Sequence, residues 1–348
     1  MKVSKNQLEV KELCVSFRNR KGTVSILDKV DFSIEKGETL CIVGESGCGK
    51  SLTSLAIMGL LPKNGEVSTG EVLFEEENLV NKSMKEMSRI RGNDMSMIFQ
   101  EPMTSLNPVH TIGKQVAETV RIHEKAGKKQ SVDRAIEMLK LVGIPSPETR
   151  IHDYPHQLSG GMRQRVMIAM ALACNPKLLI ADEPTTALDV TIQAQILELM
   201  NDLKSKLNMS IMMITHDLGV VSEMADKVLV MYAGKVVEYS NVKDLFENPK
   251  HPYTRGLIEA IPKLDEEKEN LSIIKGTVPS PENMPVGCRF ADRCPFASEI
   301  CREESPELSG ESNHQVGCWM YTDRWSEKEE NGNVSRKEGA ATGEAARS

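Results

Sequence analysis

Thr39-Leu-Cys-Ile-Val-Gly-Glu-Ser-Gly-Cys-Gly-Lys-Ser51 is the stretch that decides the fold. Its first five residues form an apolar run, as expected for a strand buried on both faces of a parallel sheet. The pattern that follows, Gly44-x-x-x-x-Gly49-Lys50-Ser51, fits a phosphate-binding loop, and residues 49–61 read as the helix that such a loop needs. A chance match in a flexible loop is the alternative, and the flanking strand and helix disfavour it.

Each residue type in this loop has a task if a nucleoside triphosphate binds. Glycines let backbone N–H groups turn inward around the phosphates, and the helix N-terminus adds partial positive charge. Lys50 is expected to reach the terminal phosphates, and the Ser51 hydroxyl is expected to bind Mg²⁺. The predicted nucleotide-binding residues of the loop are Gly44, Glu45, Ser46, Gly47, Cys48, Gly49, Lys50 and Ser51.

A second apolar run, Leu178-Leu-Ile-Ala-Asp-Glu183, ends in two carboxylates and resembles a Walker B segment. Asp182 closes a buried strand, where a carboxylate is costly unless it serves an ion, so we expect it to hold Mg²⁺ through water. Glu183 follows directly and is placed to polarise an attacking water. The alternative is that both acids only mark the solvent end of a strand.

The remaining pattern predicts an α/β fold with a parallel sheet. Residues 8–43 read as β structure, and 228–232 with 235–239 read as a hairpin. Strands alternate with helices of ordinary length, which favours parallel pairing. The predicted helices are 111–123, 131–143, 162–174 and 191–207, and further buried strands are 177–181 and 210–214.

Leu158-Ser-Gly-Gly-Met-Arg-Gln-Arg165 resembles the signature motif of ATP-binding cassette (ABC) proteins, and residues 6–262 are similar to the nucleotide-binding subunits of ABC transporters. The resemblance implies a P-loop (RecA-like) domain with an antiparallel β subdomain and a helical subdomain. It also implies roles for single residues. Gln100 matches the Q-loop glutamine that senses Mg²⁺ and nucleotide, and His216 matches the switch histidine at the γ-phosphate. Asp189 matches the end of the D-loop, Ala187-Leu-Asp189. Phe17 matches the aromatic residue that stacks on adenine.

Taken alone, Phe17 fits a core aromatic of the first strand equally well. The family mechanism places two ATP molecules between two such domains. Each ATP lies between the phosphate loop of one domain and the residues matching Ser159, Gly160 and Gly161 of the other. The glycines would permit close backbone approach, and the signature helix would direct its N-terminus at the γ-phosphate. Hydrolysis would then let the pair open.

Three further segments resemble one branch, the oligopeptide/dipeptide importer ATPases: Phe99–Pro108, His251–Leu257 and a four-cysteine module, so that the likeness covers residues 6–322. The branch implies two membrane permease subunits and, indirectly, an extracytoplasmic solute-binding protein. Met162, where ABC signatures usually carry glutamine, is typical of one of two paralogous ATPases and implies a heterodimer. Importers of nickel or sugars are the alternative, as is a soluble ABC ATPase of DNA repair or translation.

Bulk composition fits this interpretation. The 348 residues carry a net charge of −7, with a pI of about 5.7, so no electrostatic footprint for nucleic acid is expected. No apolar run approaches the ~18 residues of a membrane-spanning helix, and the first residues lack the apolar core of a secretory signal. The chain is therefore expected on the cytoplasmic face of the membrane, held there through partners.

Eight cysteines fall into two groups. Cys14, Cys41, Cys48 and Cys174 read as small buried hydrophobes. Cys288-x5-Cys294-x6-Cys301-x16-Cys318 favours a metal in a reducing compartment. An iron–sulfur cluster of the [4Fe–4S] type is expected, as the branch implies, with Zn²⁺ or no metal as alternatives. His314 is either a substitute ligand or a surface histidine.

Composition also divides the chain. We expect an ABC nucleotide-binding domain at 1–262, with its helical subdomain at about 101–160, and a four-cysteine C-terminal module at 263–322. Residues 323–348 are rich in Glu, Lys, Gly, Ala and Ser and are expected to be disordered, because they cannot bury enough apolar surface to offset their ordering entropy.

Overall fold

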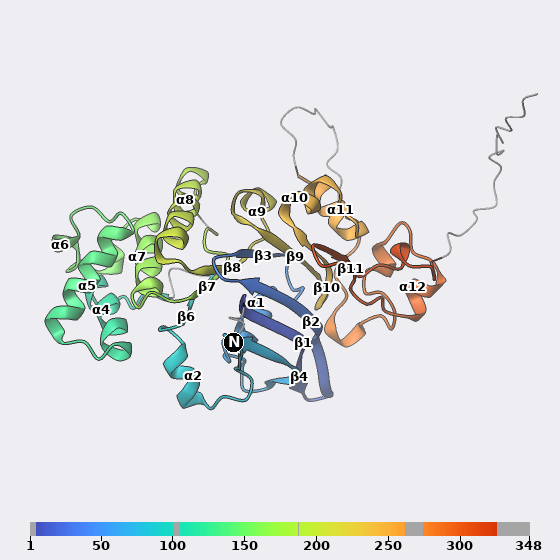
Figure 1. The fold of residues 1–348 in the computed structure, drawn as a ribbon, viewed down its shortest axis with the longest axis horizontal. Coiled ribbons are helices and arrows are strands. Elements are labelled where there is room, and N and C mark those ends of the chain that lie inside the picture. Colours follow the sequence, from blue (N-terminus) through green and yellow to red (C-terminus); the bar gives the residue numbers. More distant parts are fainter. Residues whose placement is uncertain (1–4, 101–104, 187, 262–273, 326–348) are drawn as a thin grey trace, which may run out of the picture.

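The computed structural model describes residues 5–100, 105–186, 188–261 and 274–325 (Figure 1). Its strands are β1 (Asn6–Asn19), β2 (Gly22–Glu35), β3 (Thr39–Val43), β4 (Gly65–Phe74), β5 (Glu77–Asn78), β6 (Met95–Ile98), β7 (Leu178–Asp182), β8 (Ser210–Ile214), β9 (Lys227–Tyr232), β10 (Lys235–Asn241), β11 (Ser309–Glu311) and β12 (His314–Val316). Its α-helices are α1 (Lys50–Ile57), α2 (Met84–Ile90), α4 (Ile112–His123), α5 (Lys128–Leu141), α6 (Pro147–Arg150), α7 (Gly160–Leu172), α8 (Val190–Leu207), α9 (Leu218–Met224), α10 (Val242–Glu247), α11 (Pro252–Glu259) and α12 (Glu299–Glu303).

The main sheet confirms the predicted α/β class. Its order is β11-β12-β10-β9-β3-β8-β7-β6, and the strands from β9 to β6 run parallel. Because parallel strands end at the same edge, the residues that follow β3, β6, β7 and β8 are brought together. Those residues are the ones that the sequence singled out, so the sheet order itself assembles the site.

The two faces of the main sheet bury different partners. In β3, Cys41 and Val43 point into a core shared with the helices, whereas Leu40 and Ile42 point into a core shared with β1 and β2. Every residue of β3, β7 and β8 is buried, which explains why their sequences are continuous apolar runs rather than alternating ones.

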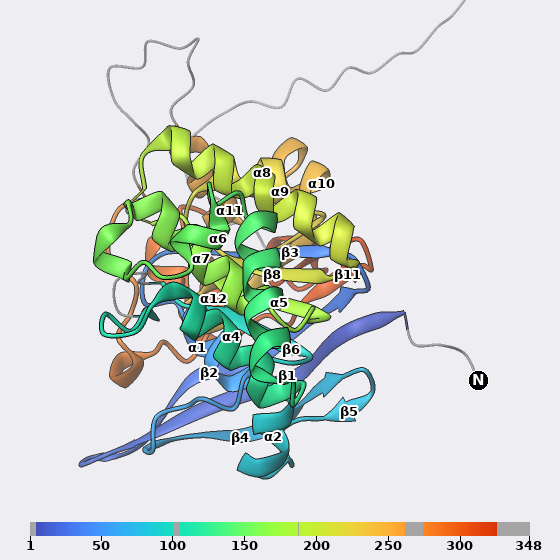
Figure 2. The ribbon, with the colours of Figure 1, turned by 90° about the vertical axis from the view of Figure 1, so that its left-hand side faces the viewer.

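A second, antiparallel sheet of order β2-β1-β4-β5 covers the face of the main sheet to which Leu40 and Ile42 point (Figure 2). The β1–β2 hairpin is long and its register shifts at several points, with Val10 opposite Phe32 and Phe17 opposite Val24. On its other edge β1 pairs with β4, which places Gly65 beside Phe17. The N-terminal β region predicted at 8–43 is confirmed.

Helices α4, α5 and α7 pack together at one end of the molecule (Figure 1). Thr111 caps α4 by accepting a hydrogen bond from the Lys114 N–H, as predicted for a helix beginning there. The contact between α4 and the residues after α6 is close. A Cβ added at Gly113 would lie 1.8 Å from Ile151 Cγ1, so only glycine fits.

The C-terminal residues join the main sheet, which the sequence did not predict. β12 pairs with β10, and β11 pairs with β12. Glu238 of β10 is fully buried there and accepts hydrogen bonds from the backbone N–H groups of Lys250 and His251. His314 Nε2 lies 2.7 Å from the same carboxylate and is itself buried, so the surface placement of His314 was wrong.

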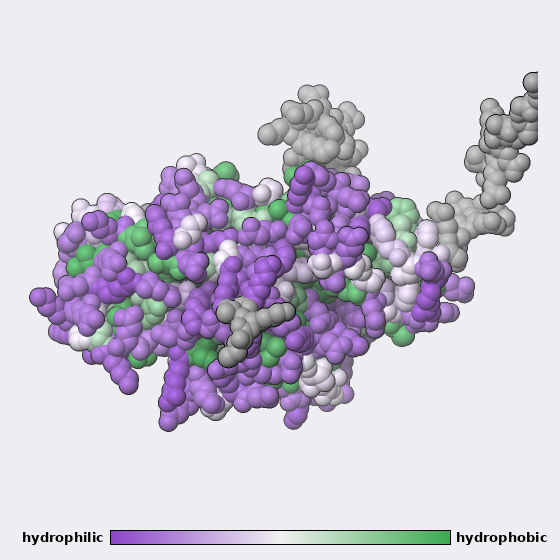
Figure 3. All heavy atoms as spheres, viewed as in Figure 1, coloured by the Kyte–Doolittle hydropathy of each residue, from purple (hydrophilic) through white to green (hydrophobic). Residues whose placement is uncertain are grey.

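No helix in the described ranges is long and apolar enough to cross a membrane. The face shown in Figure 3 is mostly hydrophilic. Of the predicted disordered tail, residues 323–325 are described, and Arg324 pairs there with Glu304; the remainder lies outside the described residues. The domain boundaries stay predictions.

Candidate functional site

The phosphate loop lies between β3 and α1, as the sequence predicts. Its glycines adopt conformations that other residues avoid, with φ of 150° at Gly44 and 105° at Gly49. A Cβ added at Gly44 would lie 2.2 Å from the Met231 carbonyl oxygen, and one at Gly49 would lie 2.6 Å from Leu27 Cδ2. Only glycine therefore permits this close passage of the loop over its neighbours.

Lys50 lies under the loop and is 6% exposed. Its Nζ donates hydrogen bonds to the carbonyl oxygens of Gly44, at 2.7 Å, and Glu45, at 3.1 Å. These contacts hold the ammonium group inside the curve of the loop. A phosphate entering the loop would meet a cation already in place.

Ser51 and Asp182 meet at the start of α1, although 131 positions separate them in the chain. The Ser51 hydroxyl donates to Asp182 Oδ1 at 3.0 Å. Burial raises the pKa of the Asp182 carboxyl, and the adjacent Glu183 charge adds to that rise. A hydroxyl and a carboxylate are oxygen donors of the kind that Mg²⁺ prefers, and a cation here would offset the cost of the buried charge. The two residues therefore fit the predicted Mg²⁺ site.

Glu183 lies just beyond β7 and is held by three side chains. Gln100 Nε2 donates to Glu183 Oε2 at 2.8 Å, Thr186 Oγ1 donates to the same oxygen at 3.0 Å, and His216 Nδ1 lies 3.3 Å from Oε1. Burial raises the pKa of the Glu183 carboxyl, but these three contacts outweigh it and the pKa falls below its usual range. The carboxylate is thus kept ionised, as a base requires.

The structure therefore brings Gln100, Glu183 and His216 together, from the ends of β6, β7 and β8. Gln100 faces Glu183 in this arrangement, so its predicted contact with Mg²⁺ stays a prediction. Thr186 was missed by sequence reasoning, because a threonine three residues after an acid carries no distinctive signal. Glu183 itself has φ of 48°, a left-handed conformation that is uncommon outside glycine and recurs at functional sites.

The signature residues lie at the start of α7. Ser159 caps the helix by accepting a hydrogen bond from the Met162 N–H. Gly161 faces α8 so closely that an added Cβ would lie 2.8 Å from Ile192 Cγ2. Within the described ranges, no hydrogen bond or ion pair joins Ser159–Gly161 to the phosphate loop of the same chain.

Two other predicted residues have local contacts of their own. Asp189 caps α8 by accepting a hydrogen bond from the Ile192 N–H at 2.9 Å. Ala187, the first residue of the predicted D-loop, lies outside the described residues. Phe17 is half-buried, and an added Cβ at Gly65 would lie 2.8 Å from its ring. The ring is thus anchored on β4, and its stacking on adenine stays a prediction.

The four C-terminal cysteines share one small region, in which Cys301 packs with Ala291 and Trp319. Burial raises the pKa of Cys288 to about 11 and that of Cys318 to about 12, and charges on the neighbouring cysteines add to both. A thiol must lose its proton to bind a metal, and burial favours the neutral form. Across residues 5–325, masked gaps aside, no three His, Cys, Asp or Glu side chains gather to hold an ion. The predicted metal at Cys288, Cys294, Cys301 and Cys318 is therefore not supported by this arrangement.

Comparison with known proteins agrees with the site. Residues 27–186 match a family model described as ABC transporter, and residues 237–301 match one described as oligopeptide/dipeptide transporter, C-terminal region. The chain is similar to the oligopeptide transport ATP-binding protein AppD of Bacillus subtilis, with 55% identity over 92% of this chain and 98% of that protein. It is 52% identical to the dipeptide transport ATP-binding protein DppD of Haemophilus influenzae, over 89% of this chain and 94% of that protein.

Among solved structures, the chain resembles a dimeric post-hydrolysis state of the ATP-binding cassette MJ0796 bound to ADP and Pi. The TM-score is 0.61 at 27% identity, over 68% of this chain and 98% of that one. The fold, the two family matches and the extent of the likeness to AppD agree. The chain therefore belongs to the oligopeptide/dipeptide transport ATP-binding proteins of the ABC transporter family.

Proposed function

We propose that this chain hydrolyses ATP to power an ABC importer of dipeptides or oligopeptides. One observation carries the proposal: the Glu183 carboxylate is held by Gln100, Thr186 and His216, beside a phosphate loop whose lysine is already in place. The relatives reported above are named for peptides, which favours that cargo over the nickel or sugars left open by the sequence.

The chemistry follows from these contacts. Lys50 and the loop N–H groups would hold the phosphates, and Glu183 would accept a proton from the water that attacks the γ-phosphate, giving ADP and inorganic phosphate. Ser51 and Asp182 would hold Mg²⁺, which supplies charge neutralisation for the phosphate oxygens when it is bound. His216 is 66% exposed and stands beside Glu183, where it can contact the γ-phosphate.

We further propose that the active site is shared between two subunits. Ser159, Gly160 and Gly161 start α7 and make no hydrogen bond to their own phosphate loop within the described residues, which fits a role in completing the site of another subunit. Met162 favours a paralogous ATPase as that subunit. Asp189 would lie at the same interface, because the start of α8 contacts the signature: an added Cβ at Gly161 would lie 2.8 Å from Ile192 Cγ2.

A groove beside Gln100 is the surface on which a permease would bind. It has a volume of about 390 Å³, and its apolar lining includes Leu60, just after α1, Met97 of β6 and Met167 of α7. Arg91 and His123 add polar groups to the same groove. Phe99 is 45% exposed at its edge and directly precedes Gln100. A short amphipathic helix of a membrane subunit fits this chemistry, because its apolar face would cover the groove. Movement of the permease would thereby shift Gln100, which holds Glu183.

The test is purification of the tagged full-length chain from membranes. We expect two permease subunits and a second ATPase subunit to accompany it, which would place the chain peripherally on the cytoplasmic face. A chain found instead in a soluble complex with nucleic acid would contradict the transport function.

The C-terminal cysteines are part of this proposal only as a prediction from the sequence. Its support is the spacing of the four cysteines, together with the contact of two of them, in which the Cys288 N–H donates to the Cys301 carbonyl oxygen at 2.8 Å. Anaerobically purified protein with a [4Fe–4S] cluster should absorb at about 400 nm and contain roughly four irons per chain. Zinc in place of iron would identify the alternative, and protein free of both metals would leave four buried thiols with a packing role.

A further inference from the structure

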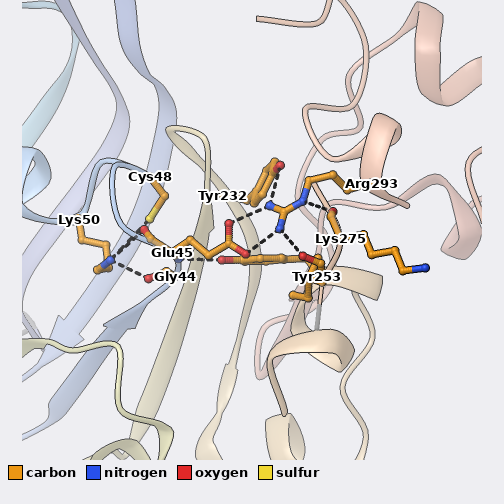
Figure 4. Close-up of polar contacts among 9 residues, drawn as sticks. Gly44, Glu45, Cys48, Lys50, Tyr232, Tyr253, Lys275 and Arg293 are labelled. Carbon is orange, nitrogen blue, oxygen red and sulfur yellow. Dashed lines mark hydrogen bonds and ion pairs between the residues drawn. The ribbon is translucent and has the colours of Figure 1, made fainter. Parts of the chain in front are cut away.

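Arg293, which lies between two of the C-terminal cysteines, reaches the phosphate loop. Its guanidinium group donates to both carboxylate oxygens of Glu45, from Nη1 at 2.8 Å and from Nη2 at 3.0 Å (Figure 4). Glu45 is the second residue of the loop, 248 positions away in sequence. A bidentate ion pair of this kind fixes both the position and the orientation of the carboxylate.

The remaining N–H groups of the guanidinium group also donate hydrogen bonds. Nε donates to the Lys275 carbonyl oxygen at 2.9 Å, Nη2 donates to the Ile274 carbonyl oxygen at 3.1 Å, and Nη1 donates to the Tyr232 hydroxyl at 3.2 Å. With the two bonds to Glu45, these contacts use all five N–H donors of an arginine. The side chain is 7% exposed and lies over the rings of Tyr232 and Phe290. Its position is therefore fixed from every side.

Glu45 is held at its backbone as well. Its N–H donates to the Tyr253 hydroxyl at 2.8 Å, and its carbonyl oxygen accepts from Lys50 Nζ at 3.1 Å. Tyr253 is fully buried in α11. The side chain of Glu45 extends toward Arg293, on the opposite side from Lys50 (Figure 4). Arg293 thus keeps a carboxylate of the loop turned away from the lysine that is expected to bind phosphate.

We propose that Arg293 is a positioning residue for ATP binding, which makes the C-terminal cysteine region part of the nucleotide site. Without Arg293 the Glu45 carboxylate would be free and unneutralised beside the phosphates. It would repel them and compete with them for Lys50. The inference rests on the proposed ATPase function and assigns a specific task to a region otherwise remote from the chemistry.

Titration calorimetry of the full-length chain with Mg²⁺-ATP and with Mg²⁺-ADP tests this proposal. Arg293→Ala should raise the Kd for ATP roughly tenfold, and the Kd for ADP less, because ADP carries less negative charge. Adding Glu45→Gln to Arg293→Ala should restore ATP affinity to within about threefold of wild type, since the repelling charge is then gone. A merely structural role of Arg293 would not be rescued in this way.

The matched control is Arg302→Ala, which removes an exposed arginine of the same region whose partner is Asp292 rather than the loop. If Arg293→Ala proves too unstable to purify, Arg293→Gln carries the test, because it keeps polarity but no charge. Wild-type ATP affinity in either variant, or a loss that Glu45→Gln fails to reverse, overturns this inference alone. A wild-type chain that binds no ATP overturns the proposed function together with it.

Discussion

Replacement of Glu183 by glutamine is expected to lower steady-state ATP turnover by roughly 100- to 10,000-fold, the usual contribution of a general base. The amide has the same size as the carboxylate, and its one oxygen can still accept the hydrogen bonds from Thr186 and Gln100. It cannot accept the proton of the attacking water. ATP binding should persist, because Lys50 and the phosphate loop are untouched.

The measurement is phosphate release by the purified transport complex at saturating ATP, with binding followed separately. Glu198→Gln is the matched control, since it makes the same change at an exposed position of α8. Turnover that is unchanged in Glu183→Gln would show that another group activates the water. Turnover lost together with ATP binding would point to a damaged site rather than to a missing base.

Replacement of Lys50 by alanine is expected to weaken ATP binding by roughly 100-fold or more, as removal of a desolvated charge-assisted contact does. Lys50 is buried under the loop, and its Nζ is held by the carbonyl oxygens of Gly44 and Glu45. In the variant those two carbonyl groups lose their donor, and the phosphates lose their cation.

Titration calorimetry with Mg²⁺-ATP measures this loss directly. Lys63→Ala, at an exposed position before β4, is the control for a change in net charge. The melting temperature of Lys50→Ala without nucleotide shows whether the loop still folds. Wild-type affinity in a folded Lys50→Ala chain would refute the assignment of this loop as the phosphate site.

The catalytic core could be predicted from sequence because its signals are local. An apolar run such as Thr39–Val43 is buried on both faces, and glycines mark where the loop passes close to neighbouring backbone. Since parallel strands end at one edge, residues after β6, β7 and β8 had to meet there. The positions of Gln100, Glu183 and His216 follow from that geometry together with the family resemblance.

The C-terminal part could not be predicted in the same way. Its contacts join residues far apart in sequence, such as Arg293 with Glu45, and no periodicity of a short segment encodes them. No apolar run surrounds His314 in the sequence, so nothing there indicates burial. In the structure its side chain is buried beside the carboxylate of Glu238. The spacing of the four cysteines does not fix their geometry. Sequence alone suggested a metal there, but among the described residues no group of side chains gathers to hold one.

ATP-dependent pairing tests the central claim most directly, namely that the phosphate loop and the signature of one chain serve two different composite sites. The measurement is the mass, by light scattering, of the Glu183→Gln chain, alone and mixed with its paralogous ATPase subunit. The account predicts that Mg²⁺-ATP doubles the mass in at least one of these samples, and that adding Ser159→Arg to the same chain abolishes the pairing while ATP still binds. Chains that are saturated with ATP yet stay single in both samples, or that pair equally well with Ser159→Arg, would contradict it.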